Sequence, residues 1–241
     1  MIRLTPIVAL DVADLTQVAT LLDQLSVGPR PIFKIGMELF YHYGPDVVKQ
    51  VQRAGFDVFL DLKLHDIPNT VERAMTVIGA LGVKLTTIHA AGGLEMLTAG
   101  KRGLKAGARQ AGIEPAKLLA ITQLTSIDDR ILHEQQHISI SLNESVQEYA
   151  KLSQTAGLAG VVCSAKEVTL IRQVVGPSFL CITPGIRPFT AQQDDQKRVV
   201  TPTKARQLGS NGIVVGRPIT QVNDPKKAYY QIAAEFTEEQ K

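Results

Sequence analysis

The chain has 241 residues, of which 44% are apolar and 20% charged, a composition typical of a globular protein with a sizeable core. Its formal net charge is only +3, it has no Trp, and it has no block of basic residues. These features argue against a nucleic-acid-binding surface, but they suit a small anionic substrate. No run approaches 18 apolar residues and the first apolar stretch is short, so we expect neither a membrane span nor a signal peptide, and a cytoplasmic location.

Short apolar segments recur along the chain and predict eight β-strands. Amphipathic segments lie between them, among them DLTQVATLLDQL, GPDVVKQVQRAG and TVERAMTVIGALG, and these predict helices. In chain order, the predicted strands are PIVALDV (6–12), PIFKIGM (31–37), DVFLDLK (57–63), LTTIHA (85–90), LLAITQL (118–124), GVVCSA (160–165), FLCITPG (179–185) and GIVVGRP (212–218).

The regular alternation of predicted strands and helices indicates the fold class. Eight units of about 30 residues each match the size of a βα repeat. No proline-rich or serine-rich linker divides the sequence. We therefore predict a (β/α)₈ barrel formed as a single domain by residues 1–241, with an open, doubly wound sheet as the alternative.

The third predicted strand carries charge where an apolar core strand is expected. Successive strand residues point to opposite faces, so Asp61 and Lys63 share a face with Phe59. The other face is entirely apolar and is expected to pack against helices; it consists of Val58, Leu60, Leu62 and Leu64. Buried charge is costly unless it is paired or functional. We therefore expect both charged side chains to point into the barrel.

Two earlier strands carry charge in equivalent places. Asp11 ends the first strand, and Lys34 lies within the second. Together with Asp61 and Lys63, these residues are expected to converge at the carboxyl ends of the strands, where active sites of this fold lie. The alternative for the set is a group of purely structural ion pairs.

Two segments indicate a phosphate site. The seventh strand runs into TPGIRP and the eighth into VGRPIT, each with a glycine for close backbone approach and an arginine, Arg187 or Arg217. Phosphate sites in these barrels lie at the same two strand ends, and guanidinium groups bind phosphate through paired hydrogen bonds. The polar stretch 188–201 follows the seventh strand and has the character of a closing lid.

Taken in order, the segments ALDV, FKIG, DLKLHDIPNTV, LTS, TPGIRP and VGRPI resemble the orotidine 5′-phosphate decarboxylase family along nearly the whole chain. The resemblance implies a cofactor-free and metal-free conversion of orotidine 5′-phosphate to UMP and CO₂ in pyrimidine biosynthesis. It also implies roles for the catalytic residues. Lys63 would protonate C6 of the pyrimidine, Asp61 would lie near the departing carboxylate, and Lys34 and Asp66 would be the outer members of a charge network.

The resemblance further implies a set of substrate contacts and a homodimer. Asp66 and Thr70 would cross the dimer interface to complete the partner's site. Gln196 on the lid would bridge base and phosphate. The expected substrate-binding residues are Asp11, Lys34, Asp61, Thr70, Thr125, Arg187, Gln196, Gly216 and Arg217.

One motif points to a different chemistry. Residues 133–137 read HEQQH, which fits the zinc-hydrolase pattern, with Glu144 or Glu148 available as a third ligand. We expect instead a solvated surface helix in a polar insertion. Two rival functions stay open: a metal-dependent sugar-phosphate lyase or aldolase of the same superfamily, and a catalytically silent phosphate-binding barrel.

Overall fold

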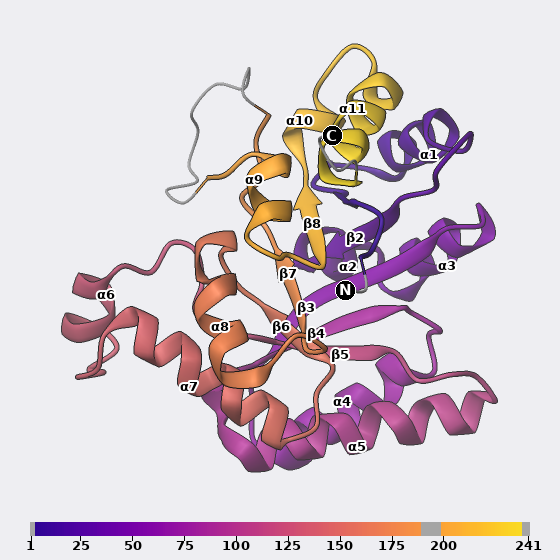
Figure 1. Ribbon diagram of the computed structural model, residues 1–241. Coiled ribbons are helices and arrows are strands. Elements are labelled where there is room, and N and C mark those ends of the chain that lie inside the picture. The colour runs from indigo at the N-terminus through magenta and orange to yellow at the C-terminus, as the bar shows by residue number, and fades with distance from the viewer. Residues whose placement is uncertain (1–2, 189–198, 238–241) are drawn as a thin grey trace.

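The computed structural model describes residues 3–188 and 199–237 and contains a closed barrel of parallel strands surrounded by helices (Figure 1). Each strand pairs with the next, and β8 closes on β1 through the pairs Ile7–Val214 and Val8–Val215. The predicted (β/α)₈ fold is confirmed, and closure excludes the open sheet. The strands are β1 (Ile7–Ala9), β2 (Ile32–Gly36), β3 (Asp57–Leu64), β4 (Leu85–His89), β5 (Lys117–Ile121), β6 (Gly160–Val162), β7 (Leu180–Thr183) and β8 (Gly212–Val215).

Helices follow the strands and cover the outside of the barrel (Figure 1). Several begin where the sequence supplies a cap: Asp14 accepts hydrogen bonds from the backbone N–H groups of Thr16 and Gln17, both at 2.9 Å. The helices are α1 (Leu15–Gln24), α2 (Met37–Tyr43), α3 (Pro45–Arg53), α4 (Pro68–Gly79), α5 (Gly93–Ala111), α6 (Asp129–Glu134), α7 (Leu142–Thr155), α8 (Val168–Val175), α9 (Pro202–Gln207), α10 (Arg217–Thr220) and α11 (Pro225–Thr237).

The buried side chains divide into two cores, as strand alternation predicts. The smaller core fills the barrel interior and includes Ile7, Phe59, Leu119 and Ile182. The larger one lies between strands and helices and receives the opposite face of β3, including Val58 and Leu60. The predicted faces of β3 are therefore confirmed, and the inward face leads directly to Asp61.

Helices α4 and α5 pack with their backbones in contact. A Cβ atom at Gly103 or Gly107 of α5 would lie far inside contact distance of the carbonyl oxygens of Glu72 or Thr76 in α4. Arg102 and Glu72 form an ion pair beside this contact. Because no side chain separates the two helices here, backbone contact sets the distance between α4 and α5.

We expect Gly103→Ala to lower the free energy of unfolding by about 2–3 kcal/mol, because the new methyl group meets backbone and not a movable side chain. Helix propensity alone predicts the opposite sign, a gain of about 1 kcal/mol. The matched control is Gly100→Ala in the same helix, where the methyl group meets the side chain of Ile88 at 2.8 Å, and a smaller loss is expected. Urea unfolding measures the free energy of unfolding of both variants. A Gly103→Ala protein as stable as the Gly100→Ala protein would contradict the packing argument.

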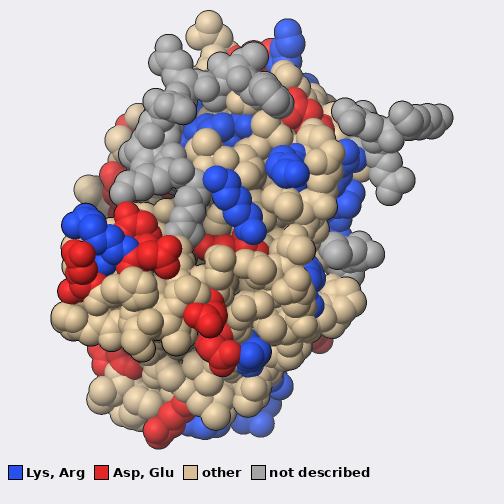
Figure 2. All heavy atoms as spheres, turned by 60° about the vertical axis from the view of Figure 1, so that its left-hand side comes forward, with Lys and Arg blue, Asp and Glu red and all other residues tan. Residues whose placement is uncertain are grey.

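The surface carries charges of both signs. On the face presented in Figure 2, basic and acidic side chains are interspersed, without a continuous basic surface. Within residues 3–188 and 199–237, no helix is long and apolar enough to cross a membrane.

Candidate active site

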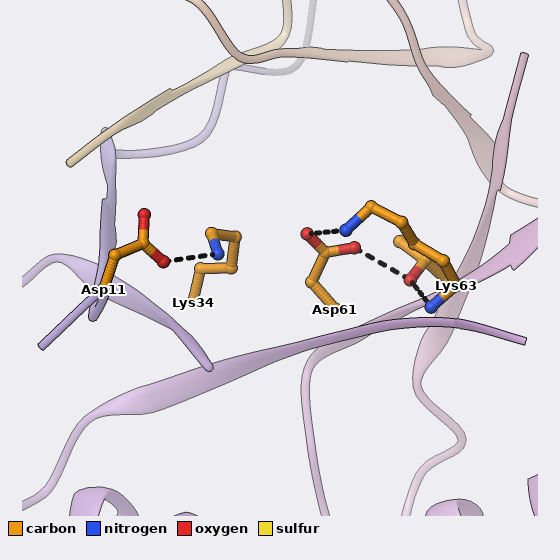
Figure 3. Close-up of polar contacts among 5 residues, drawn as sticks. Asp11, Lys34, Asp61 and Lys63 are labelled. Carbon is orange, nitrogen blue, oxygen red and sulfur yellow. Dashed lines mark hydrogen bonds and ion pairs between the residues drawn. The ribbon is translucent and has the colours of Figure 1, made fainter. Parts of the chain in front are cut away.

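Four charged side chains gather at the carboxyl end of the barrel (Figure 3). Lys34 lies in β2, Asp61 and Lys63 lie near the end of β3, and Asp11 follows β1. The backbone register aligns the first three strands, with Ala9 beside Lys34 and Gly36 beside Asp61. The charged side chains predicted on the first three strands therefore lie together at the carboxyl end of the barrel.

The four groups form two ion pairs (Figure 3). Lys63 Nζ lies 2.8 Å from Asp61 Oδ2, and Lys34 Nζ lies 3.2 Å from Asp11 Oδ1. The side chains of Asp61 and Lys34 are only 12% and 13% exposed, whereas that of Asp11 is 59% exposed. Among the described residues, Lys34 pairs with Asp11 and not with Asp61, so the four groups form two neighbouring ion pairs.

The backbone of β3 departs from regular geometry at Lys63. Its φ angle is +53°, in the left-handed region that non-glycine residues rarely occupy. The register with β4 shifts over the same stretch, from Leu60 beside Thr86 to Leu64 beside Ile88. An advance of four residues along β3 therefore corresponds to two residues along β4. This irregularity sets the direction in which the side chain of Lys63 projects from the strand.

Thr87 of β4 contacts both members of the inner ion pair. Its hydroxyl donates to Asp61 Oδ1 and accepts from the backbone N–H of Lys63, each at 2.9 Å. Thr87 was not among the predicted site residues. Strand alternation places Thr87 on the inward face with Leu85, but no pattern in the sequence reveals the register shift that brings Lys63 to it.

A cavity of about 190 Å³ opens beside these charges. Its charged side is formed by Lys34, Asp61 and Lys63, and its other walls are mostly apolar. Thr125, a predicted substrate contact, lines it together with Gln123, whose side-chain amide donates to Ser145 Oγ at 3.2 Å. The apolar lining residues are Phe59, Ile121, Leu124, Val162, Cys163, Pro184 and Val214. This combination suits a flat ring with an anionic substituent.

A second cavity, also of about 190 Å³, continues from the first at the ends of β7 and β8. The two share Lys34, Pro184 and Val214. The predicted phosphate residues Arg187, Gly216 and Arg217 all line the second cavity. Gly216 leaves the space that a side chain would fill, since a Cβ there would lie 3.3 Å from Asp11 Oδ2.

The chain beside Arg187 is anchored by backbone hydrogen bonds. The N–H of Arg187 donates to the carbonyl of Val200 at 3.0 Å, and the N–H of Val200 donates to the carbonyl of Gly185 at 3.2 Å. The predicted lid, residues 188–201, begins directly after Arg187 and includes Val200. Gln196 and the lid residues 189–198 lie outside the described residues.

Asp66 and Thr70 do not line either of these cavities. Both are exposed and lie along a groove of about 580 Å³ formed by α2, the end of β3 and α4, which shares Lys63 with the first cavity. The carboxylate of Asp66 accepts a hydrogen bond from the N–H of Ile67 at 2.6 Å. The groove carries exposed apolar side chains, including Tyr41 at 74% exposure and Val77 at 62%.

His89 ends β4 next to the inner ion pair and was also not selected from the sequence. Burial first, and then the neighbouring His65 and Lys63, lower the pKa of His89 below its ordinary value of 6.5. Its imidazole is therefore mainly neutral at pH 7. The rings of His65 and His89 have centroids 5.5 Å apart.

The HEQQH segment is not a continuous helix, which corrects the expectation of a surface helix over this motif. Helix α6 ends at Glu134, and His137 has a φ angle of +56°. The chain turns back, and His133 Nδ1 lies 2.7 Å from the carbonyl oxygen of Ile138. Within the described part of the chain, no group of three His, Cys, Asp or Glu side chains is arranged to hold a metal ion.

The fold and the site together define a (β/α)₈-barrel enzyme with paired lysines and aspartates beside an arginine-lined cavity. The sequence profile of the "Orotidine 5'-phosphate decarboxylase / HUMPS family" matches residues 5–232. Two proteins named orotidine 5'-phosphate decarboxylase, from Latilactobacillus sakei and Lactiplantibacillus plantarum, are each 55% identical to the chain. These alignments cover 95% and 96% of the chain, and 96% and 98% of the two relatives.

Solved structures agree with this comparison. The crystal structure of orotidine 5'-phosphate decarboxylase from Lactobacillus acidophilus has a TM-score of 0.87 and 43% identity, covering 97% of this chain and 99% of that one. The enzyme of the same name from Pyrococcus horikoshii has a TM-score of 0.73 at 19% identity, a likeness of fold alone. The chain belongs to the orotidine 5′-phosphate decarboxylase / HUMPS family.

Proposed function

We propose that the chain decarboxylates orotidine 5′-phosphate to UMP and CO₂, as a cytoplasmic step of pyrimidine nucleotide synthesis. The observation that carries this proposal is the continuity of two cavities. One has a lysine–aspartate pair beside apolar walls, and the other has two arginines, with Lys34 bordering both. A pyrimidine ring with its carboxylate fits the first, a phosphate fits the second, and the ribose spans Lys34 and Asp11.

In the proposed reaction, the bond between C6 and the carboxylate carbon breaks, and its electron pair stays on C6 as CO₂ departs. The Lys63 ammonium lies beside Asp61 and stabilises this negative charge as it develops. It then donates a proton to C6, forming UMP, and is reprotonated from solvent.

Asp61 contributes by repulsion. Two like charges about 4 Å apart repel by about 4 kcal/mol at an effective dielectric of about 20. A substrate carboxylate placed beside Asp61 experiences this repulsion, and the departure of neutral CO₂ removes it. The low exposure of Asp61 supports the role, because the side chain is poorly screened by water.

We also propose that the chain acts as a homodimer in which Asp66 and Thr70 of one subunit complete the site of the other. Their position supports this: they line the apolar groove beside β3 and α4 and not the cavity of their own subunit. The proposed role of Gln196 is to join base and phosphate when the lid closes.

The decisive experiment follows the loss of orotidine 5′-phosphate absorbance by the purified protein in the presence of a chelator. Rapid decarboxylation is expected, because Lys63 and Asp61 supply the electrostatic stabilisation in the proposed mechanism. No turnover with or without metal would overturn the proposal and favour a phosphate-binding barrel without activity. Turnover that requires added magnesium or zinc would favour a metal-dependent lyase.

Arg217→Ala is expected to lower kcat/KM for orotidine 5′-phosphate by roughly 10- to 100-fold, because charge-assisted hydrogen bonds to phosphate contribute about 1.5–3 kcal/mol. Part of the decrease in kcat/KM should appear as a lower kcat, since binding of a remote phosphate also helps to close an active site. The same variant should leave kcat/KM for orotidine, which has no phosphate, nearly unchanged. Arg109→Ala, which removes an exposed arginine from α5, is the charge-matched control. Equal losses with both substrates would exclude phosphate recognition by Arg217.

A further inference from the structure

Thr87 is a fully buried residue on the inward face of β4, with 0% of its surface exposed. Its hydroxyl has a single proton, which it donates to Asp61 Oδ1. The oxygen then has its lone pairs free to accept the Lys63 N–H. One hydroxyl therefore holds the carboxylate of Asp61 and the backbone of Lys63 at the same time.

The irregular backbone explains why this hydroxyl is needed. The regular pairing of β3 with β4 stops at Leu60 and resumes at Leu64, so Lys63 lies inside the interruption. An N–H group in a partly buried position requires an acceptor. The side chain of Thr87 supplies that acceptor, and it supports a left-handed conformation that lysine seldom adopts on its own.

We propose that Thr87 is a positioning residue for the reaction, which sets both the Asp61 carboxylate and the Lys63 ammonium in place. The inference rests on the proposed decarboxylation. Lys63 Nζ approaches Oδ2 of Asp61 (Figure 3). Thr87 binds Oδ1, so the carboxylate is held at both oxygens. Without the hydroxyl, the carboxylate keeps only its contact with Lys63 Nζ, and the turn at Lys63 loses its hydrogen bond.

The neighbouring residue provides a matched control. Thr86 is equally buried, at 0% exposure, but strand alternation places it on the face opposite to Leu85, away from the barrel interior. Its hydroxyl has no hydrogen-bond partner among the described residues. Thr86→Val and Thr87→Val make the same chemical change one residue apart in one strand, so any general cost of replacing a buried threonine appears in both.

The first test measures kcat and KM for orotidine 5′-phosphate with Thr87→Val, Thr87→Ser and Thr86→Val. Thr87→Val is expected to lower kcat roughly 100-fold or more, as small misplacements of catalytic groups do, with KM within a few-fold of wild type. Thr87→Ser keeps the hydroxyl and should stay within about tenfold of wild type, while Thr86→Val should match wild type. A folded Thr87→Val with normal kcat, or a Thr87→Ser as slow as the valine variant, would overturn the proposal.

The second test does not depend on activity. Amide hydrogen exchange at Lys63, followed by NMR, is expected to accelerate by at least roughly tenfold in Thr87→Val and to remain slow in Thr87→Ser. If the valine variant does not fold, Thr87→Ala takes its place. Unchanged exchange at Lys63 in a folded variant without the hydroxyl would refute the hydrogen-bond role. A wild-type protein that fails to decarboxylate would instead refute the proposed function, with the exchange result still valid.

Discussion

Lys63→Ala is expected to lose at least about 10⁴-fold in kcat while retaining its fold and its affinity for UMP. The ammonium has two roles in the proposed mechanism, stabilising charge at C6 and delivering the proton, and each contributes about 10²-fold or more. Asp61 keeps its hydrogen bond from Thr87, so the remaining carboxylate is still held in place. Steady-state turnover and calorimetric titration with UMP measure the two quantities separately.

The control for this variant lies at the opposite end of the same strand. Lys84 pairs with Asp57, the first residue of β3, far from the mouth of the barrel. Lys84→Ala also removes a lysine–aspartate pair from β3, and it should leave kcat unchanged. Substantial decarboxylation by a well-folded Lys63→Ala protein would remove Lys63 from the proposed mechanism.

Mixing two inactive variants should restore activity if Asp66 serves the neighbouring subunit. Lys63→Ala and Asp66→Ala are each expected to be nearly inactive as pure dimers. In a mixed dimer, one site lacks both groups, whereas the other has its own Lys63 and receives Asp66 from its partner. With random exchange about half of the dimers are mixed, so roughly a quarter of all sites should work.

Subunit exchange has to be verified in the same sample, for example by mass spectrometry of differently tagged chains. Dimers that exchange but stay at the activity of the parents would place Asp66 in its own subunit's site. The position of Asp66 makes the experiment informative: the residue lies only three positions after Lys63, but it lines the groove alone, whereas Lys63 lines both the groove and the first cavity. A protein that is monomeric in solution would contradict the proposed dimer directly.

Much of the fold was predictable because the strands are short, apolar and evenly spaced. Strand alternation correctly placed Phe59 inside the barrel and Val58 against the helices, since a period of two requires only local sequence. The same rule brought Lys34 and Asp61 to the mouth of the barrel. Local sequence was sufficient wherever the backbone was regular.

Local sequence was insufficient where the backbone is irregular. The left-handed turn at Lys63 and the hydrogen bonds of Thr87 arise from a register shift between β3 and β4, a relation between strands that single-sequence periodicity does not contain. The prediction of a surface helix over the HEQQH segment was wrong for a related reason. Its helix ends early because the chain turns back, so that His133 meets the carbonyl of Ile138.

The backbone conformation at Lys63 also implies a conflict between the stability of the protein and its proposed catalytic activity. Glycine adopts a left-handed conformation freely, whereas another residue pays about 1–2 kcal/mol to do so. A selection for thermal resistance alone would therefore disfavour lysine at a position with a φ angle of +53°. The proposed chemistry requires an amine there. At this position, stabilising the protein and preserving the proposed turnover demand different amino acids.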